Sequence, residues 1–377
     1  MIISIINMNV MFFKKFLYRL SPLFSLLFFF SAVSIAQKDS ARSHHILVFP
    51  VVAKSIETSW SFGLAGATTF HISKSDTLTR TSNIQSVLLY SLKKQLIAAV
   101  NGTVYFHNEE YILQEQLSYS SYPDKFWGLG NRSPDSAVED YSFKQYYIYL
   151  HLMRNLGNNL FAGLLFEFQD LMQVNYLQGG IFDQQNIVGR NPYKVSGLGL
   201  SFTYDTRNDA FAPDKGYFAQ TYFNHFDHVF GSTYNYTNVV VDLRKYFRFY
   251  KQQVLAVQAY GFSNIGNDVP LRSLASFGGS NMMRGYYAGR YKDEQQLVLQ
   301  TEYRMPVYKR IGAVVFYSLG NVGKTLSDFS LNDFKYSYGA GVRIKLSKSE
   351  RLNLRLDYGI GQGKNNSGFY LQLGEAF

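Results

Sequence analysis

The stretch RLNLRLDYGI, Arg351 to Ile360, alternates strictly between two kinds of side chain. Polar or small residues occupy every second position from Arg351 to Gly359, and apolar residues occupy the positions between them. Successive side chains of a β-strand point to opposite faces, so the pattern predicts a strand with one polar and one apolar face. Strands of a membrane barrel have this pattern, because one face meets lipid and the other meets a polar lumen.

The same alternation recurs in the segments 336–346 and 299–305, where the charged residues again share one face. These are Arg343 and Lys345 in the first segment, and Glu302 and Arg304 in the second. A soluble β-sandwich is the alternative, but its strands are usually shorter. The chain is also 17% aromatic, with 30 Tyr and 32 Phe, which favours the aromatic girdles of an outer-membrane barrel. We therefore predict an all-β, transmembrane antiparallel β-barrel.

Counting alternating segments gives about sixteen strands, an even number that fits a closed single-chain barrel. Short turns such as Ser347-Lys348-Ser349 alternate with long connections such as 122–139 and 175–191. We expect the short turns on the periplasmic side and the long loops outside. The strands are predicted to begin near Ile46, Thr58, Thr81, Gln95, Tyr111, Ser142, Leu160, Ser196, Gly216, Tyr234, Gln253, Gln296, Arg310, Lys335, Arg351 and Ser367.

Residues 1–36 have the features of a cleaved secretory signal: a basic start, an apolar segment over 20–33, and small residues at Ser34-Ile35-Ala36. A membrane anchor helix is the alternative, but the apolar run is shorter than the roughly 20 residues it needs. We expect a short segment over 37–45, too short for a periplasmic domain, and the barrel over 46–377.

The overall charge and the absence of cysteine exclude several classes of protein. With no cysteine, an exported chain folds without disulfides. The formal net charge is +10, but the basic residues are spread singly and form no aromatic-lined groove for nucleic acid. We expect no nucleic acid, no metal ion and no cofactor to be bound, and expect outer-membrane lipids as the surroundings.

The stretch GGSNMMRGYYAGR, Gly278 to Arg290, lies in a connection of about 30 residues that a barrel wall does not require. Its glycines allow the backbone to reverse, and Arg284 is the charged side chain presented among them. We predict a loop folded into the lumen. The alternative is an exposed loop with a solvated arginine.

Three ordered stretches carry a resemblance: GLGLSFTYDTRNDAFAPDKGYF from Gly197, GGSNMMRGYY followed by LVLQTEYRMPV, and FYSLGNVG from Phe316. The chain resembles the barrel domain of the BamA/TamA superfamily of outer-membrane assembly and translocation proteins, without its periplasmic domains. The resemblance implies that Arg284, Gly285 and Tyr286 form the tip of the lumen loop. It also implies Glu302 as an acidic partner of the arginine, and Ser318 at the position where a second, usually an aspartate, is found.

The resemblance extends to a turn and to the last strand. Asp205, Arg207, Asp209, Pro213 and Gly216 match a turn of the family, and we expect a structural role for them. Phe369, Leu371, Leu373 and Phe377 resemble, at alternate positions, the signal by which outer-membrane barrels are recognised for insertion. The plainer interpretation is a last strand facing lipid. Glu375 stands where an apolar residue is usual.

The resemblance implies a function at the bacterial outer membrane: assisting the insertion or translocation of polypeptides. The partners would be unfolded outer-membrane or secreted polypeptides, or a periplasmic partner protein. The alternative is a membrane platform or narrow pore that works with a separately encoded partner. We expect no enzymatic activity, because none of the seven histidines has a recognisable Ser/Asp arrangement.

Overall fold

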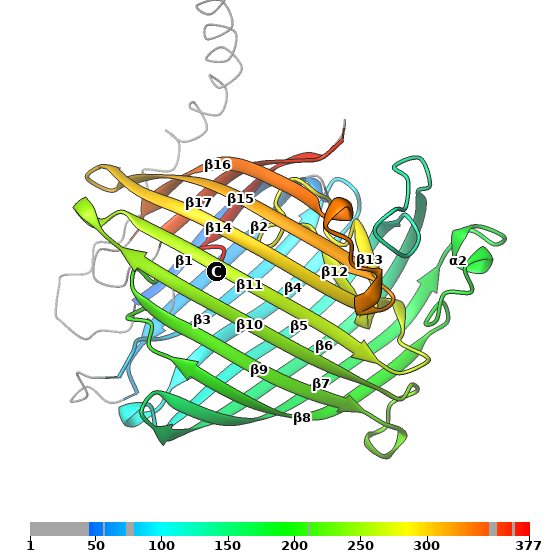
Figure 1. Cartoon of the computed structure of the whole chain (residues 1–377), viewed down its shortest axis with the longest axis horizontal. Helices are drawn as coiled ribbons and strands as arrows, with labels where there is room; N and C mark the ends of the chain where they lie inside the picture. Colours follow the sequence, from blue (N-terminus) through cyan, green and yellow to red (C-terminus); the bar gives the residue numbers. More distant parts are fainter. Residues whose placement is uncertain (1–44, 56, 73–78, 210–211, 347–352, 364–365) are drawn as a thin grey trace, which may run out of the picture. The chain divides into compact units, whose positions relative to one another are not determined.

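The computed structural model describes residues 45–55, 57–72, 79–209, 212–346, 353–363 and 366–377. Within them, sixteen antiparallel strands follow one another in chain order in a single sheet (Figure 1). The strands are β1 (His45–Ser55), β2 (Ser59–Phe70), β3 (Ser82–Ser91), β4 (Leu96–Tyr105), β5 (Tyr111–Phe126), β6 (Glu139–Gly157), β7 (Leu160–Asn175), β8 (Tyr193–Asp205), β9 (Gly216–Phe226), β10 (Tyr236–Arg248), β11 (Val254–Ile265), β14 (Gln295–Tyr308), β15 (Ile311–Gly323), β16 (Lys335–Lys345), β17 (Asn353–Gly361) and β18 (Ser367–Leu373). Two short strands, β12 (Ala275–Phe277) and β13 (Tyr291–Asp293), pair with each other inside the connection between β11 and β14.

The sheet is a transmembrane antiparallel β-barrel, as predicted. The first and last strands lie side by side, with Cα atoms of β1 and β18 within 8 Å of each other. Each described strand begins within three residues of its predicted start. Arg351 and Leu352, where the fifteenth strand was predicted to begin, lie outside the described residues. The accuracy has a physical reason: a period of two with charge on one face is strongly specified when the other face meets lipid.

The alternation assigns side chains to the two faces of the wall as expected. On β17, Asn353, Arg355 and Asp357 are buried inside the barrel, whereas Tyr358 is exposed outside. No helix of the described residues is long and apolar enough to cross a membrane.

The two ends of the barrel differ in their connections. At one end, here called the short-turn end, Asn158 and Asn159 alone join β6 to β7, and both have positive φ (51° and 62°). Two such residues form the primed turns that match the twist of paired strands. At the opposite, long-loop end, residues 176–192 join β7 to β8 and residues 266–294 join β11 to β14. The predicted turn Ser347-Lys348-Ser349 lies outside the described residues.

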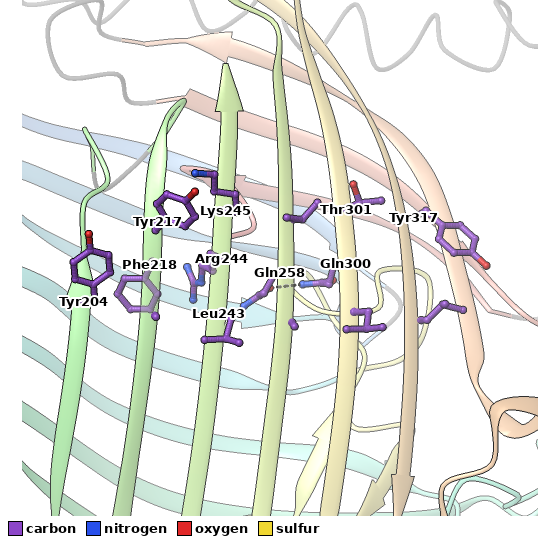
Figure 2. Close-up of a pocket in the computed structure, with 15 residues that line it drawn as sticks. Tyr204, Tyr217, Phe218, Leu243, Arg244, Lys245, Gln258, Gln300, Thr301 and Tyr317 are labelled. Atoms are coloured by element: carbon purple, nitrogen blue, oxygen red, sulfur yellow. Dashed lines mark hydrogen bonds between the residues drawn. The ribbon is translucent and has the colours of Figure 1, made fainter. Parts of the chain in front are cut away.

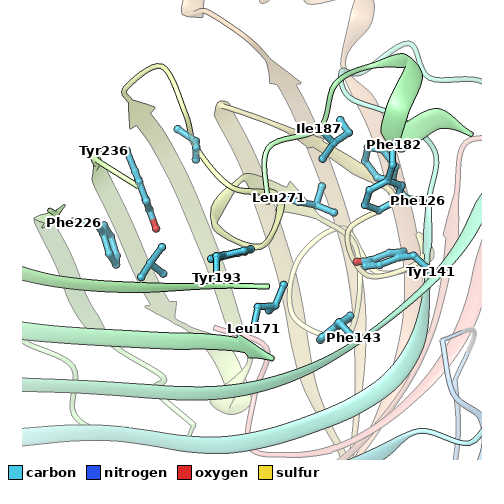
Figure 3. Packing of buried hydrophobic residues seen from close by; sticks show 12 residues of the cluster. Phe126, Tyr141, Phe143, Leu171, Phe182, Ile187, Tyr193, Phe226, Tyr236 and Leu271 are labelled. Carbon is cyan, nitrogen blue, oxygen red and sulfur yellow. The ribbon is translucent and has the colours of Figure 1, made fainter. Parts of the chain in front are cut away.

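An apolar cluster packs inside the long-loop end of the barrel (Figure 3). Phe182, from the short helix α2 (Ile181–Gln184), is fully buried, with its ring 4.9 Å from that of Phe126 and 5.1 Å from that of Tyr141. Val269 and Leu271, from the start of the loop between β11 and β14, belong to the same cluster. The lumen is therefore filled by side chains at this end.

We predict that Phe182→Ala opens this cluster without unfolding the wall. Removal of a buried phenylalanine ring costs about 3–5 kcal/mol, and here the loss falls on a loop that carries none of the sheet's ladder bonds. Trypsin should cleave after Arg190 faster, while the folded barrel keeps its mobility on unheated SDS gels. Leu177→Ala, at a loop residue that is 66% exposed, is the control. Equal cleavage of the two variants would contradict this role of Phe182.

Candidate functional site

The loop between β11 and β14 folds into the barrel and lies against the inner face of β14 to β18. Its tip reverses at Gly285, whose φ of 116° is one that a side chain rarely allows. A Cβ at Gly285 would lie 2.5 Å from the backbone nitrogen of Gly361. The glycine therefore serves two needs: the turn itself and a close approach to β17.

Arg284 is fully buried and forms ion pairs with two carboxylates on different strands. Its Nη2 lies 2.5 Å from Oε1 of Glu302 on β14, and its Nη1 lies 2.5 Å from Oδ2 of Asp357 on β17. The guanidinium carbon also lies 3.6 Å from the ring centre of Phe316. A planar guanidinium with several donors can bond both carboxylates at once, which a lysine ammonium does less well. The loop tip is thus tied to two strands of the wall.

The structure places Glu302 beside Arg284, as the resemblance implies, but it does not place Ser318 there. Ser318 Oγ instead donates to Oε1 of Gln300 at 3.2 Å. Gln300 in turn accepts from the backbone N–H of Met283 at 3.3 Å and donates to the carbonyl of Asn281 at 3.1 Å. Hydrogen bonds therefore link Ser318 to the loop through the amide of Gln300.

Asp357 supplies the second carboxylate, and sequence reasoning missed this partnership. The signal was present, because the alternation of β17 already placed Asp357 on the lumen face. Asp357 Oδ1 also accepts from Arg343 on β16 at 2.5 Å. Arg355 donates to the loop carbonyl of Ser280 at 3.0 Å, and Arg304 lies 2.8 Å from Glu302. Buried charges are stable only when they are paired and bonded in this way.

Tyr286 is fully buried, and its hydroxyl makes two bonds with the wall. It donates to the carbonyl of Tyr336 at 2.8 Å and accepts from the N–H of Gln362 at 2.8 Å. Space for the ring exists because Gly361 lacks a side chain: a Cβ there would lie 2.7 Å from Cζ of Tyr286. Gly359 likewise leaves space for the backbone of Arg284, because a Cβ at Gly359 would lie 2.5 Å from the backbone carbonyl carbon of Arg284.

The last strand also bonds directly to the loop tip. The hydroxyl of Tyr370, on β18, accepts from the N–H of Gly285 at 3.0 Å and donates to the carbonyl of Tyr286 at 3.3 Å. Because β18 is the strand that lies beside β1, this contact links the loop to the junction between the first and last strands.

The residues after β18 turn into the lumen, so the predicted alternation does not extend to Phe377. Phe369 is 56% exposed on the outer face, and Leu371 and Leu373 are half-buried on the same strand. The strand ends at Leu373, and Gly374 has a φ of 82°. Phe377 is buried in a cluster with Tyr246, Val254 and Ala256 of β10 and β11. The expectation that it lies on the lipid face is therefore wrong, because the turn at Gly374 breaks the period of two.

Glu375, which departs from the apolar pattern, has three partners inside the barrel, and the most distant is Arg304, whose Nε lies 3.8 Å from Oε2. Its Oε2 lies 2.6 Å from Nε of Arg343, and its Oε1 accepts from Nδ2 of Asn353 at 2.7 Å. Arg304 donates to the carbonyl of Phe377 at 2.9 Å. A chain of ion pairs therefore runs from Arg284 through Asp357 and Arg343 to Glu375.

The turn between β8 and β9 contains one internal ion pair and two with arginines from elsewhere, one of which joins Arg248 to Asp214 at 3.3 Å. Arg207 Nε lies 2.9 Å from Asp205 Oδ1, and Arg80, before β3, lies 2.6 Å from Asp205 Oδ2. Asp209 accepts from the N–H of Ala212 at 2.8 Å.

The backbone of this turn is fixed by a glycine and by one contact across the lumen. Gly216 has a φ of 108°, and a Cβ there would lie 2.3 Å from the carbonyl oxygen of Thr206. The carbonyl of Pro213 accepts from Arg304 at 3.4 Å. The turn thus reaches the same arginine that pairs with Glu302.

Residues 61–377 match the family model of the Omp85 superfamily domain. The chain belongs to the Omp85 superfamily. The resemblance to BamA and TamA noted in the sequence is thereby confirmed. The inward loop, the Arg284 pairs and the last strand described above are therefore features of an Omp85 barrel.

Solved structures share the fold at low sequence identity. BamA from Haemophilus ducreyi lacking POTRA domains 1–3 has 15% identity and a TM-score of 0.54, with 88% of this chain and 70% of that chain covered. CdiB from Acinetobacter baumannii has 10% identity and a TM-score of 0.53, with 88% of this chain and 65% of that chain covered. CdiB from Escherichia coli has 11% identity and a TM-score of 0.58, with 90% of this chain and 63% of that chain covered. The chain thus spans 63% to 70% of their lengths. No curated protein matches it.

We predict that Arg284→Lys destabilises the Omp85 barrel by about 2 kcal/mol, because one of the two buried carboxylates loses its bond from this side chain and keeps only its bond from Arg304 or Arg343. Urea unfolding in micelles, followed by circular dichroism, measures the change. Arg132→Lys is the matched control: this arginine also pairs with a carboxylate, Asp333, but it is 82% exposed. It should leave the unfolding midpoint unchanged. Equal midpoints for the two variants would contradict the proposed importance of the Arg284 pairs.

We predict that docking of the β12–β13 hairpin weakens as pH rises from 5 to 7. Burial raises the pKa of Asp293, on β13, to about 6, above the roughly 3.9 of an unfolded chain. Between these values the docked loop holds a proton that the unfolded loop has released, so docking loses stability as pH rises through 6. Burial also raises the pKa of Glu294, which acts in the same direction. Burial lowers the pKa of Lys292 to about 8, so this lysine stays protonated between pH 5 and 7.

Hydrogen exchange at the hairpin amides, corrected for intrinsic rates, should therefore be slower at pH 5 than at pH 7. Asp293→Asn should reduce that difference. An unchanged difference in this variant would show that another group is responsible.

Proposed function

We propose that the protein is an outer-membrane barrel that assists the insertion or translocation of polypeptides. The observation that supports this most directly is the double attachment of the lumen loop. Arg284 ties the loop to β14 and β17, and Tyr370 ties it to β18, the strand beside β1. In this proposal, release of the loop empties part of the lumen and loosens the last strand in one movement.

A loosened last strand could accept another chain by ordinary strand pairing. A strand at the edge of a sheet presents unpaired N–H and C=O groups, and an extended polypeptide can add to it. The docked loop and the apolar cluster around Phe182 occupy part of the lumen. That filling argues against a wide, permanently open channel.

The proposed mechanism needs no cofactor, metal ion or catalytic group. Among the described residues, no three His, Asp or Glu side chains could together hold a metal ion. His151 and Ser201 approach each other, with Nε2 and Oγ 2.6 Å apart, but both side chains are buried. The other ring nitrogen of His151 faces the amide of Gln114, where a hydrolase triad usually has a carboxylate. We assign this contact to packing of the wall.

The alternative proposal is a membrane platform or narrow pore that works with a separately encoded partner. This alternative is supported by the partial coverage of BamA and CdiB: 70% and 65% of those chains are matched, so each contains parts that this chain does not match. The two proposals differ in what loop release does: it admits a client strand in the first and only ions in the second.

A reversible lock on the loop tests the proposal. A Cβ at Gly320 would lie 3.2 Å from Cγ of Met283, close to the separation of Cβ and Sγ across a disulfide. The pair Met283→Cys and Gly320→Cys would contain the chain's only thiols. The same sample can therefore be compared with the loop locked and with it released by a reductant.

We predict that the reduced pair, in phospholipid vesicles, speeds the folding of an added unfolded outer-membrane barrel severalfold over empty vesicles. Oxidation should abolish this acceleration, whereas Met283→Cys alone should be insensitive to oxidation. Folding at the rate of empty vesicles under reducing conditions would overturn the proposal. Ion conductance that appears only on reduction, without faster folding, would establish the narrow pore instead.

A further inference from the structure

The outer, lipid-facing wall is hollowed between β8 and β15 (Figure 2). The hollow has a volume of about 600 Å³, within the range of pockets that hold small ligands. Gln258 and Gln300 bond to each other at 2.8 Å on the inner face behind it. Alternate residues of six strands form its outer surface.

Strand register explains why the wall is hollow here. One cross-strand row places Lys245 beside Val257, Val257 beside Thr301, and Thr301 beside Tyr317. The next row places Leu243 beside Ala259, and Ala259 beside Leu299. The small side chains fall in the middle of both rows, and larger ones stand on either side.

The hollow continues lengthwise along β11. The outward residues in this part of the strand, from the short-turn end onward, are Leu255, Val257, Ala259 and Gly261. A Cβ at Gly261 would have no atom within 4 Å. Residues that become smaller toward the middle of the membrane form a shallow channel in the direction of a lipid tail.

An outward-facing cation lies at one end of this channel. Lys245 points outward, with its ammonium 2.8 Å from the ring centre of Tyr217 and 5.2 Å from that of Phe247. Among the described residues no carboxylate pairs with it. It lies three residues before the end of β10, about 10 Å from the short-turn end at 3.3 Å per residue. An aromatic belt and a cation at this depth mark the level of lipid headgroups.

We propose that this channel is a binding site for one anionic phospholipid of the leaflet at the short-turn end. The phosphate pairs with Lys245, and one acyl chain lies along β11 over Val257, Ala259 and Gly261. The positively charged lysine can pair with an anionic group, and the apolar channel beyond it can bury a hydrocarbon chain. A phospholipid carries both in this order, and each buried CH₂ adds about 0.8 kcal/mol of transfer free energy. The inference does not rest on the proposed function.

The test is native mass spectrometry of the detergent-purified protein equilibrated with dioleoyl phosphatidylglycerol. The parent should retain one lipid under conditions that remove the rest. Lys245→Gln, which removes the charge, and Ala259→Phe, which fills the channel, should each reduce retention about tenfold. Both side chains face lipid, and mobility on unheated SDS gels verifies that the variants are folded. Dioleoylglycerol, which lacks the phosphate, should be retained about tenfold less by the parent.

Two matched variants serve as controls. Lys309→Gln removes a lysine whose ammonium also stands over a ring, 5.0 Å from that of Tyr308, in the turn between β14 and β15. Ala162→Phe enlarges an outward alanine of β7, outside the channel. Both should retain lipid like the parent. Equal retention by all four variants, or equal retention of dioleoylglycerol and phosphatidylglycerol by the parent, would overturn the proposal and indicate unspecific annular lipid.

Discussion

The buried Arg284 guanidinium, held between Glu302 and Asp357, is the interaction on which the interior of this barrel depends. A charge of this kind cannot stay inside a protein without partners, because the loss of hydration costs several kcal/mol for each ion. The two carboxylates come from strands that are three places apart in the sheet. The arginine therefore fixes the loop and also bridges part of the wall. Gly285, Gly359 and Gly361 are required because the backbone must come close enough for those bonds to form.

Around this centre, four arginines and three carboxylates form one connected network. Arg304 pairs with Glu302 on its own strand, and Arg355 pairs with Asp357 on its own strand. Arg343 reaches Asp357 from β16, and Glu375 joins from the turn after β18. The network is strongly directional, because each planar guanidinium can hydrogen-bond to a carboxylate in only a few orientations. The loop, the last strand and the residues after it are consequently positioned by one another, and movement of one changes the environment of the others.

Much of this fold could be predicted from the sequence, for a specific reason. Alternation such as that of Asn353 to Tyr358 is a local signal, and it identified about sixteen strands and the inward faces of three of them. Glu302 could be assigned to the loop through resemblance, together with its place on the lumen face. Asp357 could be placed on the lumen face but not paired, because its partner lies 73 residues earlier and contact depends on how the barrel closes. Phe377 was misplaced because a positive φ at Gly374, which no alternation reveals, turns the chain inward.

The distance in sequence between Arg284 and its partners also constrains how the barrel is assembled. Glu302 follows the arginine by 18 residues, whereas Asp357 follows it by 73 and Tyr370 follows Gly285 by 85. The loop tip therefore has partners far along the chain as well as one nearby. It can take up its final place only after β17 and β18 have joined the sheet. The complete set of contacts at the loop tip therefore requires β17 and β18 to be paired in register with the wall.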